Sequence, residues 1–206
     1  MEEGEYYHIF NRGVNREEIF KEERNYEFFL RRYQYYLRDY LETYAYCLMP
    51  NHFHLLVRIK EPEPAKDLRG FRNLVGLKPA GVEKQGLAPL DKAFKNFFTS
   101  YAKAINKAYD RTGSLFQNRF KKKLVEDDSY FSSLVAYIHL NPVNARLCKE
   151  PEDWPYSSYN SFLGDSNQIV PVEKKEVFDW FGDKEEFINF HKITDQEPQL
   201  TKYTFD

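Results

Sequence analysis

Residues 52–59 constrain the fold more than any other stretch of the chain. Side chains alternate between the two faces of a β-strand. One set of alternate positions is entirely apolar: Phe53, Leu55, Val57 and Ile59. The other set is mostly polar: His52, His54, Leu56 and Arg58. The pattern predicts a strand in a sheet whose first face packs on helices and whose second face is open to a substrate.

Three more strands are expected around this one. Residues 6–12 form the first, 43–48 the second and 115–125 the fourth. The connection between the second and third strands is short, Met49-Pro50-Asn51. Two strands joined this closely should pair antiparallel.

Helices are predicted between and after these strands. Residues 26–40 and 91–109 carry apolar side chains at three- and four-residue spacing, and Asn25 is the expected N-cap of the first. A third helix should begin after Asp127 or Asp128 and run to about residue 140. The order strand–helix–strand–strand–helix–strand predicts an α+β, ferredoxin-like fold, with an antiparallel sheet, helices on one face and one additional helix.

Two segments fit this scheme less closely. Residues 61–90 contain four prolines and four glycines and should form a long loop, with one short helical turn near 68–74. From residue 151 the chain becomes acidic, with short helices expected at 174–181 and 184–191. We therefore divide the chain into a main domain, residues 1–150, and an acidic extension, residues 151–206, that packs on or beside it.

Charge and composition indicate which partners and which cellular location the chain can have. The net charge is −2, but residues 1–150 hold 25 Lys/Arg and 20 Asp/Glu, whereas residues 151–206 hold 5 and 12. A basic body allows a nucleic-acid partner, and the 17% aromatic content would supply rings that stack on bases. No apolar run is long enough to span a membrane. Two cysteines imply no disulfide framework, and a cytoplasmic location is expected.

The paired histidines suggest a metal site. His52 and His54 lie two residues apart on the predicted open face, so both imidazoles can converge on one cation. A His-x-His pair alone is more often a pair of surface or hydrogen-bonded histidines. A zinc site that includes Cys47 is a weaker alternative, because Cys47 belongs to another strand.

The third helix offers a nucleophile. At about 100° per residue, its buried stripe comprises Phe131, Leu134, Val135 and Ile138. Tyr137 lies to one side of this stripe, with Asn141 one turn later on the same flank, whereas His139 points the other way. By itself Tyr137 fits a packing residue better than a catalyst. A phenol has a pKa near 10, so attack on a phosphodiester would need a cation that offsets the developing charge.

Five segments, in this order, resemble the HUH single-tyrosine transposases, most closely the REP-associated tyrosine transposases. They are Tyr7-His8-Ile9-Phe10-Asn11-Arg12-Gly13, Met49-Pro50-Asn51-His52-Phe53-His54-Leu55-Leu56-Val57, Gly113-Ser114-Leu115-Phe116-Gln117-Asn118-Arg119-Phe120, Tyr137-Ile138-His139-Leu140-Asn141-Pro142-Val143 and Trp154-Pro155-Tyr156-Ser157-Ser158-Tyr159. Together they span most of residues 6–160.

The resemblance implies a metal-dependent transposase. Tyr137 would attack single-stranded DNA next to a hairpin, leaving a 5′-phosphotyrosine and a free 3′-hydroxyl, so strands can be rejoined without ATP. His52, His54 and Asn141 would bind Mg²⁺ or Mn²⁺. The expected DNA contacts are Arg12, Arg58, Arg119, Lys121, Lys122 and Lys123. A homodimer is one option for its assembly.

Two alternatives use the same fold. A binding module that does not cleave would explain the basic strand and the aromatic residues, but it needs neither the histidine pair nor Tyr137. A transposase descendant retained for a host role would keep the fold and could lack cleavage. The long loop and the acidic extension depart from the family pattern.

Overall fold

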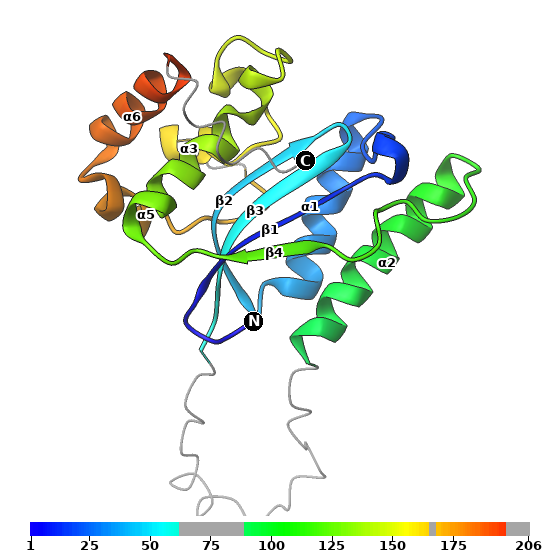
Figure 1. Ribbon diagram of the computed structural model, residues 1–206. Helices are drawn as coiled ribbons and strands as arrows, with labels where there is room; N and C mark the ends of the chain where they lie inside the picture. The colour runs from blue at the N-terminus through cyan, green and yellow to red at the C-terminus, as the bar shows by residue number, and fades with distance from the viewer. Residues whose placement is uncertain (62–88, 165–167, 197–206) are drawn as a thin grey trace, which may run out of the picture.

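The computed structural model describes residues 1–61, 89–164 and 168–196 (Figure 1). It contains a four-stranded antiparallel sheet in the order β2-β3-β1-β4. The strands are β1 (Tyr6–Arg12), β2 (Leu41–Met49), β3 (His52–Ile59) and β4 (Lys121–Leu124). Helices α1 (Glu23–Leu37) and α2 (Leu90–Ala108) connect them in the order βαββαβ. The ferredoxin-like α+β fold is therefore confirmed.

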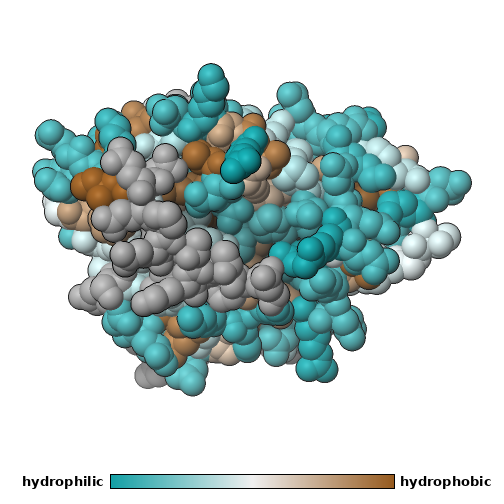
Figure 2. Space-filling view, turned by 45° about the horizontal axis from the view of Figure 1, so that its top comes forward, coloured by the Kyte–Doolittle hydropathy of each residue, from teal (hydrophilic) through white to brown (hydrophobic). Residues whose placement is uncertain are grey.

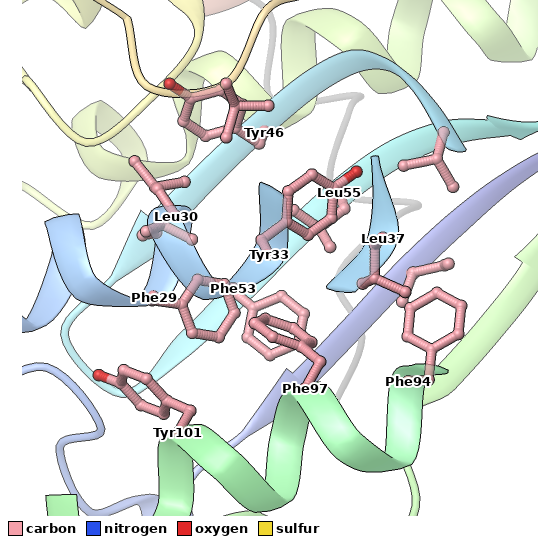
Figure 3. Close-up of a cluster of buried hydrophobic side chains, with 14 of the residues drawn as sticks. Phe29, Leu30, Tyr33, Leu37, Tyr46, Phe53, Leu55, Phe94, Phe97 and Tyr101 are labelled. Atoms are coloured by element: carbon pink, nitrogen blue, oxygen red, sulfur yellow. The ribbon is translucent and has the colours of Figure 1, made fainter. Parts of the chain in front are cut away.

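The larger core lies between the sheet and helices α1 and α2. Phe29 and Tyr33 of α1, Phe97 and Tyr101 of α2 and Phe53 of β3 are all fully buried there (Figure 3). Their rings meet edge to face or tilted, as between Phe29 and Phe97 at 4.8 Å, which is a favourable geometry for aromatic pairs. The apolar positions of β3 all belong to this core, as the alternation predicted.

Several boundaries differ from the expectation, those of α1 and β4 among them. Helix α1 begins at Glu23 with Glu22 as its N-cap, and Asn25 lies in the first turn, where its side chain completes a capping box. The prediction of Asn25 as N-cap was wrong. Its side-chain oxygen accepts the Glu22 N–H from the third helical position, which is the second half of a capping box. Strand β4 has only four residues, since residues 113–120 form an irregular connection in which Arg119 has a φ of 62°.

A second layer of helices covers part of the other sheet face. It consists of α3 (Asp128–Asn144), α4 (Tyr159–Leu163), α5 (Lys174–Phe181) and α6 (Lys184–Gln196) (Figure 1). Helix α3 packs mainly on β2, through Phe131, Leu134, Val135 and Ile138. This sheet face is thus open only in part, because the apolar stripe of α3 needs a partner.

Helix α3 continues through Pro142 to Asn144, although Asn141-Pro142 predicted its end. A proline without an N–H removes one helical hydrogen bond and disfavours helical geometry before it. Here it stands in the last turn, where the bond that is lost is one of the final ones. Asn141 therefore stays on the helix, one turn after Tyr137.

The motif at residues 154–159 has a structural role in the sheet. It runs along the free edge of β2: Leu48 N–H donates to Tyr156 O and Ser158 N–H donates to Tyr46 O, each at 2.9 Å. The Trp154 indole donates to Leu48 O at 3.0 Å. An exposed strand edge invites unwanted pairing, and this segment covers it.

The described part of the acidic extension shares a hydrophobic cluster with α3, to which Tyr159, Phe162, Val177 and Phe187 contribute. The Glu176 carboxylate accepts hydrogen bonds from Tyr44 at 2.6 Å and from Tyr6, which attaches α5 to the sheet. The helices predicted at 174–181 and near 184–191 are present. The division at residue 150 stays a prediction, and the turn expected near 68–74 lies outside the described residues.

The surface is mainly hydrophilic, with hydrophobic side chains in small separate patches on the face that Figure 2 shows. In the part of the chain that the structure describes, no helix is both long and apolar enough to cross a membrane.

Candidate active site

His52 is placed by the two-residue turn between β2 and β3. Pro50 O accepts the N–H groups of Ile19 and Phe20, at 2.8 and 3.0 Å, so the turn is attached to the segment before α1. His52 Nδ1 lies 2.6 Å from Asn51 Oδ1, and His52 Nε2 lies 3.2 Å from Asn141 Oδ1. The turn thus positions this imidazole, and its second nitrogen faces the end of α3.

These two contacts bear on a metal. Burial lowers the pKa of His52 to about 4, so the ring is neutral near pH 7 and carries one proton. We assign that proton to Nδ1, which makes the shorter contact, with Asn51. The Nε2 lone pair then faces the Asn141 oxygen, and a cation between them would satisfy both. Adjacent ligands of an octahedral ion with bonds of about 2.1 Å lie about 3.0 Å apart, close to the observed separation.

His54 lies deeper, with 4% of its surface exposed. Its Nδ1 is 2.9 Å from Nε2 of the fully buried His8 on β1. This contact does not use the Nε2 atom of His54. The ring centroid of His54 is 5.1 Å from that of His52 and 5.4 Å from that of Tyr137. His54 therefore occupies the centre of the group.

His8 was missed by the sequence reasoning, although the signal was present. In β1 it alternates with Tyr7 and Ile9, which face the larger core, and it pairs across the sheet with Leu56. Its contact with His54 resembles the outer partners that commonly orient metal-binding histidines. Burial lowers the pKa of His8 to about 3 and that of His54 well below its ordinary value, so both rings are neutral, the form in which a histidine binds a metal.

Tyr137 projects from α3 toward these imidazoles and is 9% exposed. Burial raises the pKa of its phenol, whereas a side-chain hydrogen bond with Asn141 lowers it. The net direction is upward, so the hydroxyl keeps its proton at neutral pH. Nucleophilic attack by this group would therefore require help in removing or offsetting that charge.

A pocket of about 270 Å³ joins these groups. Its polar lining includes Tyr137, both histidines and three basic residues, Arg12, Arg16 and Lys121. Among the described residues that line it there is no aspartate or glutamate. Such a pocket is suited to an anion, and a phosphate bound there would meet both the basic rim and the phenol.

Arg16 reaches this pocket through a tight loop that the sequence reasoning did not single out. A Cβ on Gly13 would lie 2.0 Å from Glu17 O, so only glycine permits this close approach. Asn15 and Arg16 follow with φ values of 53° and 60°. The last residue of the motif 7–13 is thus needed for the shape of the rim.

The other predicted DNA contacts are spread over a wider surface. Lys121 and Lys123 are on the same sheet face as the histidines, because they pair with Phe10 and His8. Lys122 faces the α2 side, where it and Arg119 line a separate hollow. Lys121 lines the pocket itself, whereas Arg119, Lys122 and Lys123 lie outside its lining.

Arg58 is not in this group. It is six residues from His52 along β3, about 20 Å at the usual rise of a strand. Its guanidinium donates to Gly4 O at 3.0 Å and to Glu42 at 3.4 Å. Its predicted role in DNA binding is untested, and its ion pair supplies an ordinary structural explanation.

Two other groups lie outside the pocket. Cys47 shares the His54 face, but its thiol contacts Met49 sulfur at 3.8 Å and burial raises its pKa well above the ordinary value. This disfavours the thiolate that zinc binds. His139 points away from Tyr137, as predicted, and bonds His191 and Ser158 instead. Within the described ranges no three His, Cys, Asp or Glu side chains form a metal site by themselves.

Comparison with known proteins supports the resemblance. The chain is 29% identical over 119 residues to the "Putative REP-associated tyrosine transposase" of Haemophilus influenzae, an alignment that covers 58% of this chain and 59% of that protein. The chain therefore spans less than two thirds of the relative that it matches. No protein-family model matches it.

A solved structure shows the same fold. It is that of a REP-associated tyrosine transposase bound to a REP hairpin, with a TM-score of 0.57, 15% identity and coverage of 84% of this chain and 92% of that chain. The predicted resemblance to the REP-associated tyrosine transposases is thus confirmed, in sequence by the first relative and in fold by the second.

Proposed function

We propose that this chain is a transposase that nicks and rejoins single-stranded DNA beside a hairpin, with Tyr137 as the nucleophile. One observation carries the proposal: a single pocket brings together a helix tyrosine, two neutral imidazoles and three basic side chains. A module that only binds nucleic acid would need the basic side chains but has no use for the other groups.

Arg12, Arg16 and Lys121 would hold the phosphodiester in the pocket. Their charges favour the anion and orient it toward Tyr137. His52, His54 and Asn141 would hold a divalent cation, Mg²⁺ or Mn²⁺; imidazole ligands favour Mn²⁺. When bound, the cation would polarise the phosphate and offset charge that develops during attack. Since the described residues of the pocket lining include no carboxylate, the DNA phosphate itself would supply the anionic ligand.

The reaction exchanges one phosphoester bond for another. The Tyr137 oxygen attacks phosphorus, the bond to the 3′ oxygen breaks, and the DNA 5′ end remains as a phosphotyrosine. The phenol loses a proton and the leaving 3′ oxygen gains one, so the step is neutral overall. Rejoining is the reverse: a 3′-hydroxyl attacks the phosphotyrosine and Tyr137 recovers its proton. No energy source is required, because the number of phosphoester bonds stays constant.

The hairpin partner is inferred from the comparisons. The structural neighbour is bound to a REP hairpin, and the sequence relative carries the same family name. The basic residues of β4 and the connection before it extend the positive surface beyond the pocket. DNA phosphates would meet this surface on the way to Tyr137.

The test uses a pool of labelled DNA hairpins with randomised single-stranded flanks, incubated with Mg²⁺ or Mn²⁺. A covalent protein–DNA adduct should appear on a denaturing gel, and sequencing the captured DNA would identify the target. Tyr137→Phe should abolish the adduct and His52→Ala should reduce it sharply. Tyr130→Phe is the matched control, because Tyr130 is a buried tyrosine two turns earlier on α3.

The outcomes separate the alternatives. An adduct that survives Tyr137→Phe would show that another residue is the nucleophile. Tight hairpin binding with no adduct under either cation would favour a binding module or a descendant that has lost cleavage. Light scattering on the same complexes would decide whether a homodimer forms, which stays a prediction.

A further inference from the structure

A second hollow of about 890 Å³ lies between α2 and the connection 113–120 that leads to β4. We call it the α2 groove. Figure 1 shows the chain returning from the end of α2 to β4 along this side of the sheet. Asn11 and Gln117 line both the α2 groove and the pocket of Tyr137. The two hollows are therefore neighbours with a shared wall.

The floor of the α2 groove is aromatic. Phe98 of α2 is half-buried, and its ring centroid is 5.4 Å from those of Phe116 and Phe120. Phe120, also half-buried, packs on Phe94 of the larger core. The core fixes these rings from below, so their position does not depend on a ligand.

The walls of the α2 groove are basic. Lys95 and Lys103 project from α2, and Arg119 and Lys122 project from the opposite side. All four side chains are exposed, and Asp91 is the single acidic residue among the described residues that line the groove. The lining therefore has a formal charge of +3. Arg119 has the left-handed backbone noted above, a geometry uncommon outside glycine and one that often marks binding segments.

We propose that the α2 groove binds the unpaired DNA nucleotides that continue from the phosphodiester held beside Tyr137. The lysines and the arginine would follow the backbone phosphates, and the rings of Phe98 and Phe120 would stack on bases. This combination of a basic track with aromatic platforms is typical of single-strand binding. A duplex would keep its bases stacked on one another and could not use the floor. The proposal rests on the proposed function, because it names where the strand next to the nick lies.

The test measures binding of fluorescein-labelled oligo(dT) of about 12 nucleotides in EDTA, so that no metal-dependent cleavage occurs. Lys95→Glu/Lys103→Glu reverses two groove charges, and Lys92→Glu/Lys107→Glu makes the same change at exposed α2 positions outside the groove lining. The groove pair should weaken binding about tenfold or more and lower the salt slope of log K by about 1.4. The control pair should change affinity less than about threefold, through long-range charge alone.

A second readout locates the bases. An oligonucleotide with 5-iodouracil should crosslink to Phe98 or Phe120 on ultraviolet irradiation, with the site mapped by mass spectrometry. Equal weakening by the two charge pairs, or crosslinks confined to other surfaces, would overturn the proposal. So would duplex DNA, or an acidic peptide, that competes as well as the single strand.

The two proposals can fail separately. If the Tyr137 adduct forms but the groove pair binds oligo(dT) like the wild type, the nuclease proposal stands and the α2 groove is wrong. If no adduct forms on any hairpin but the groove pair loses binding, the α2 groove stands and cleavage is wrong.

Discussion

Both faces of the sheet pack against helices, but they do so with different residues. Against α1 and α2, strands β1 and β3 present mainly apolar or aromatic side chains, such as Ile9 and Phe53, and the polar Asn11 lies at the end of β1 beside the pocket. Against α3, the same strands present His8 and His54, buried to nearly the same degree. Polar groups cost free energy when buried without partners. The face toward α1 and α2 therefore stabilises the fold, whereas the face toward α3 carries the free-energy cost of burying two histidines.

The cost is reduced by pairing neutral rings. His8 and His54 share a hydrogen bond on the sheet, and His139 and His191 share another between α3 and α6, each at 2.9 Å. The His191 Nδ1–H donates to Phe187 O at 2.7 Å, so its Nε2 must accept from His139. Each pair needs an uncharged imidazole as its acceptor, which is His191 in the second pair. The difference between the faces therefore predicts different responses to mutation, acid and metal.

The largest contrast concerns an aromatic ring on each face. Phe29→Ala on the α1–α2 side should destabilise the protein by about 3–5 kcal/mol, because a fully buried ring is lost. Tyr137→Phe on the α3 side should cost about 1 kcal/mol, the value of one hydrogen bond. Urea unfolding at pH 7 measures both. Similar losses for the two variants would mean that the Tyr137 hydroxyl is mainly structural.

Acid should weaken the α3 side selectively. Burial lowers the pKa of His191 to about 4, whereas the unfolded chain takes up that proton near pH 6.5. Above pH 6.5 this group adds no pH dependence. Between about pH 6.5 and 4 it should remove about 1.4 kcal/mol of stability per pH unit.

The measurement is urea unfolding in EDTA at several pH values, comparing the slope rather than the absolute stability. His191→Leu should reduce the slope by about 1.4 kcal/mol per pH unit, and Lys192→Leu, at the exposed neighbouring position, should leave it unchanged. A slope unaltered by His191→Leu would mean that the folded protein accepts the proton without penalty.

His8 tests whether the buried pair serves the metal. His8→Phe keeps an aromatic ring beside Phe10 but removes the partner of His54. Loss of such an outer partner typically weakens metal binding about 10–100-fold. Electron paramagnetic resonance of Mn²⁺ with oligonucleotide, in the Tyr137→Phe background, measures this affinity. Tyr7→Phe, the adjacent residue on the other face, should bind Mn²⁺ as the parent does, and equal affinities for both variants would remove His8 from this role.

The smallest effect separates two arginines. Arg12→Ala should weaken oligonucleotide binding about five- to tenfold, since Arg12 lines the pocket. Arg58→Ala should change it less than twofold, with a stability loss of up to about 1 kcal/mol from the half-exposed pair with Glu42. Fluorescence anisotropy measures the affinities. A loss for Arg58→Ala as large as for Arg12→Ala would show that DNA extends along the whole of β3.

Local patterns predicted much of the fold. Local patterns gave the bounds of β1, β3 and α5 without error and those of α2 to within one residue. The predicted β2 was short by two residues at its start, the predicted α1 was displaced by three, and the predicted α6 ended five residues early. These signals are local, because strand and helix periodicity depend on neighbouring residues. The end of α3 and the length of β4 were less accurate, since a proline in a last turn and an irregular connection depend on what packs against them.

The site divided in the same way. His52 and His54 could be paired from a two-residue spacing, and Tyr137 from its flank of a helix. His8 was missed although its alternation in β1 placed it on the same face, and its contact with His54 lies across two strands. Arg16 could not be assigned, because its role depends on a loop shaped by Gly13. Arg58 was grouped with the histidines because it lies on the same face of β3. Two residues on one face of a strand can still be far apart along it, as Arg58 and His52 are.

The sequence by itself determined the order of the elements, the two-faced character of β3 and the residue types from which a phosphoryl-transfer site could be built. Only the tertiary structure decided that α3 crosses the second face beside His54 and that the α2 groove adjoins the pocket. The physical reason is range. Side-chain periodicity is set by bonds between neighbours, whereas an active site is set by packing between segments some 80 residues apart, as His54 and Tyr137 are.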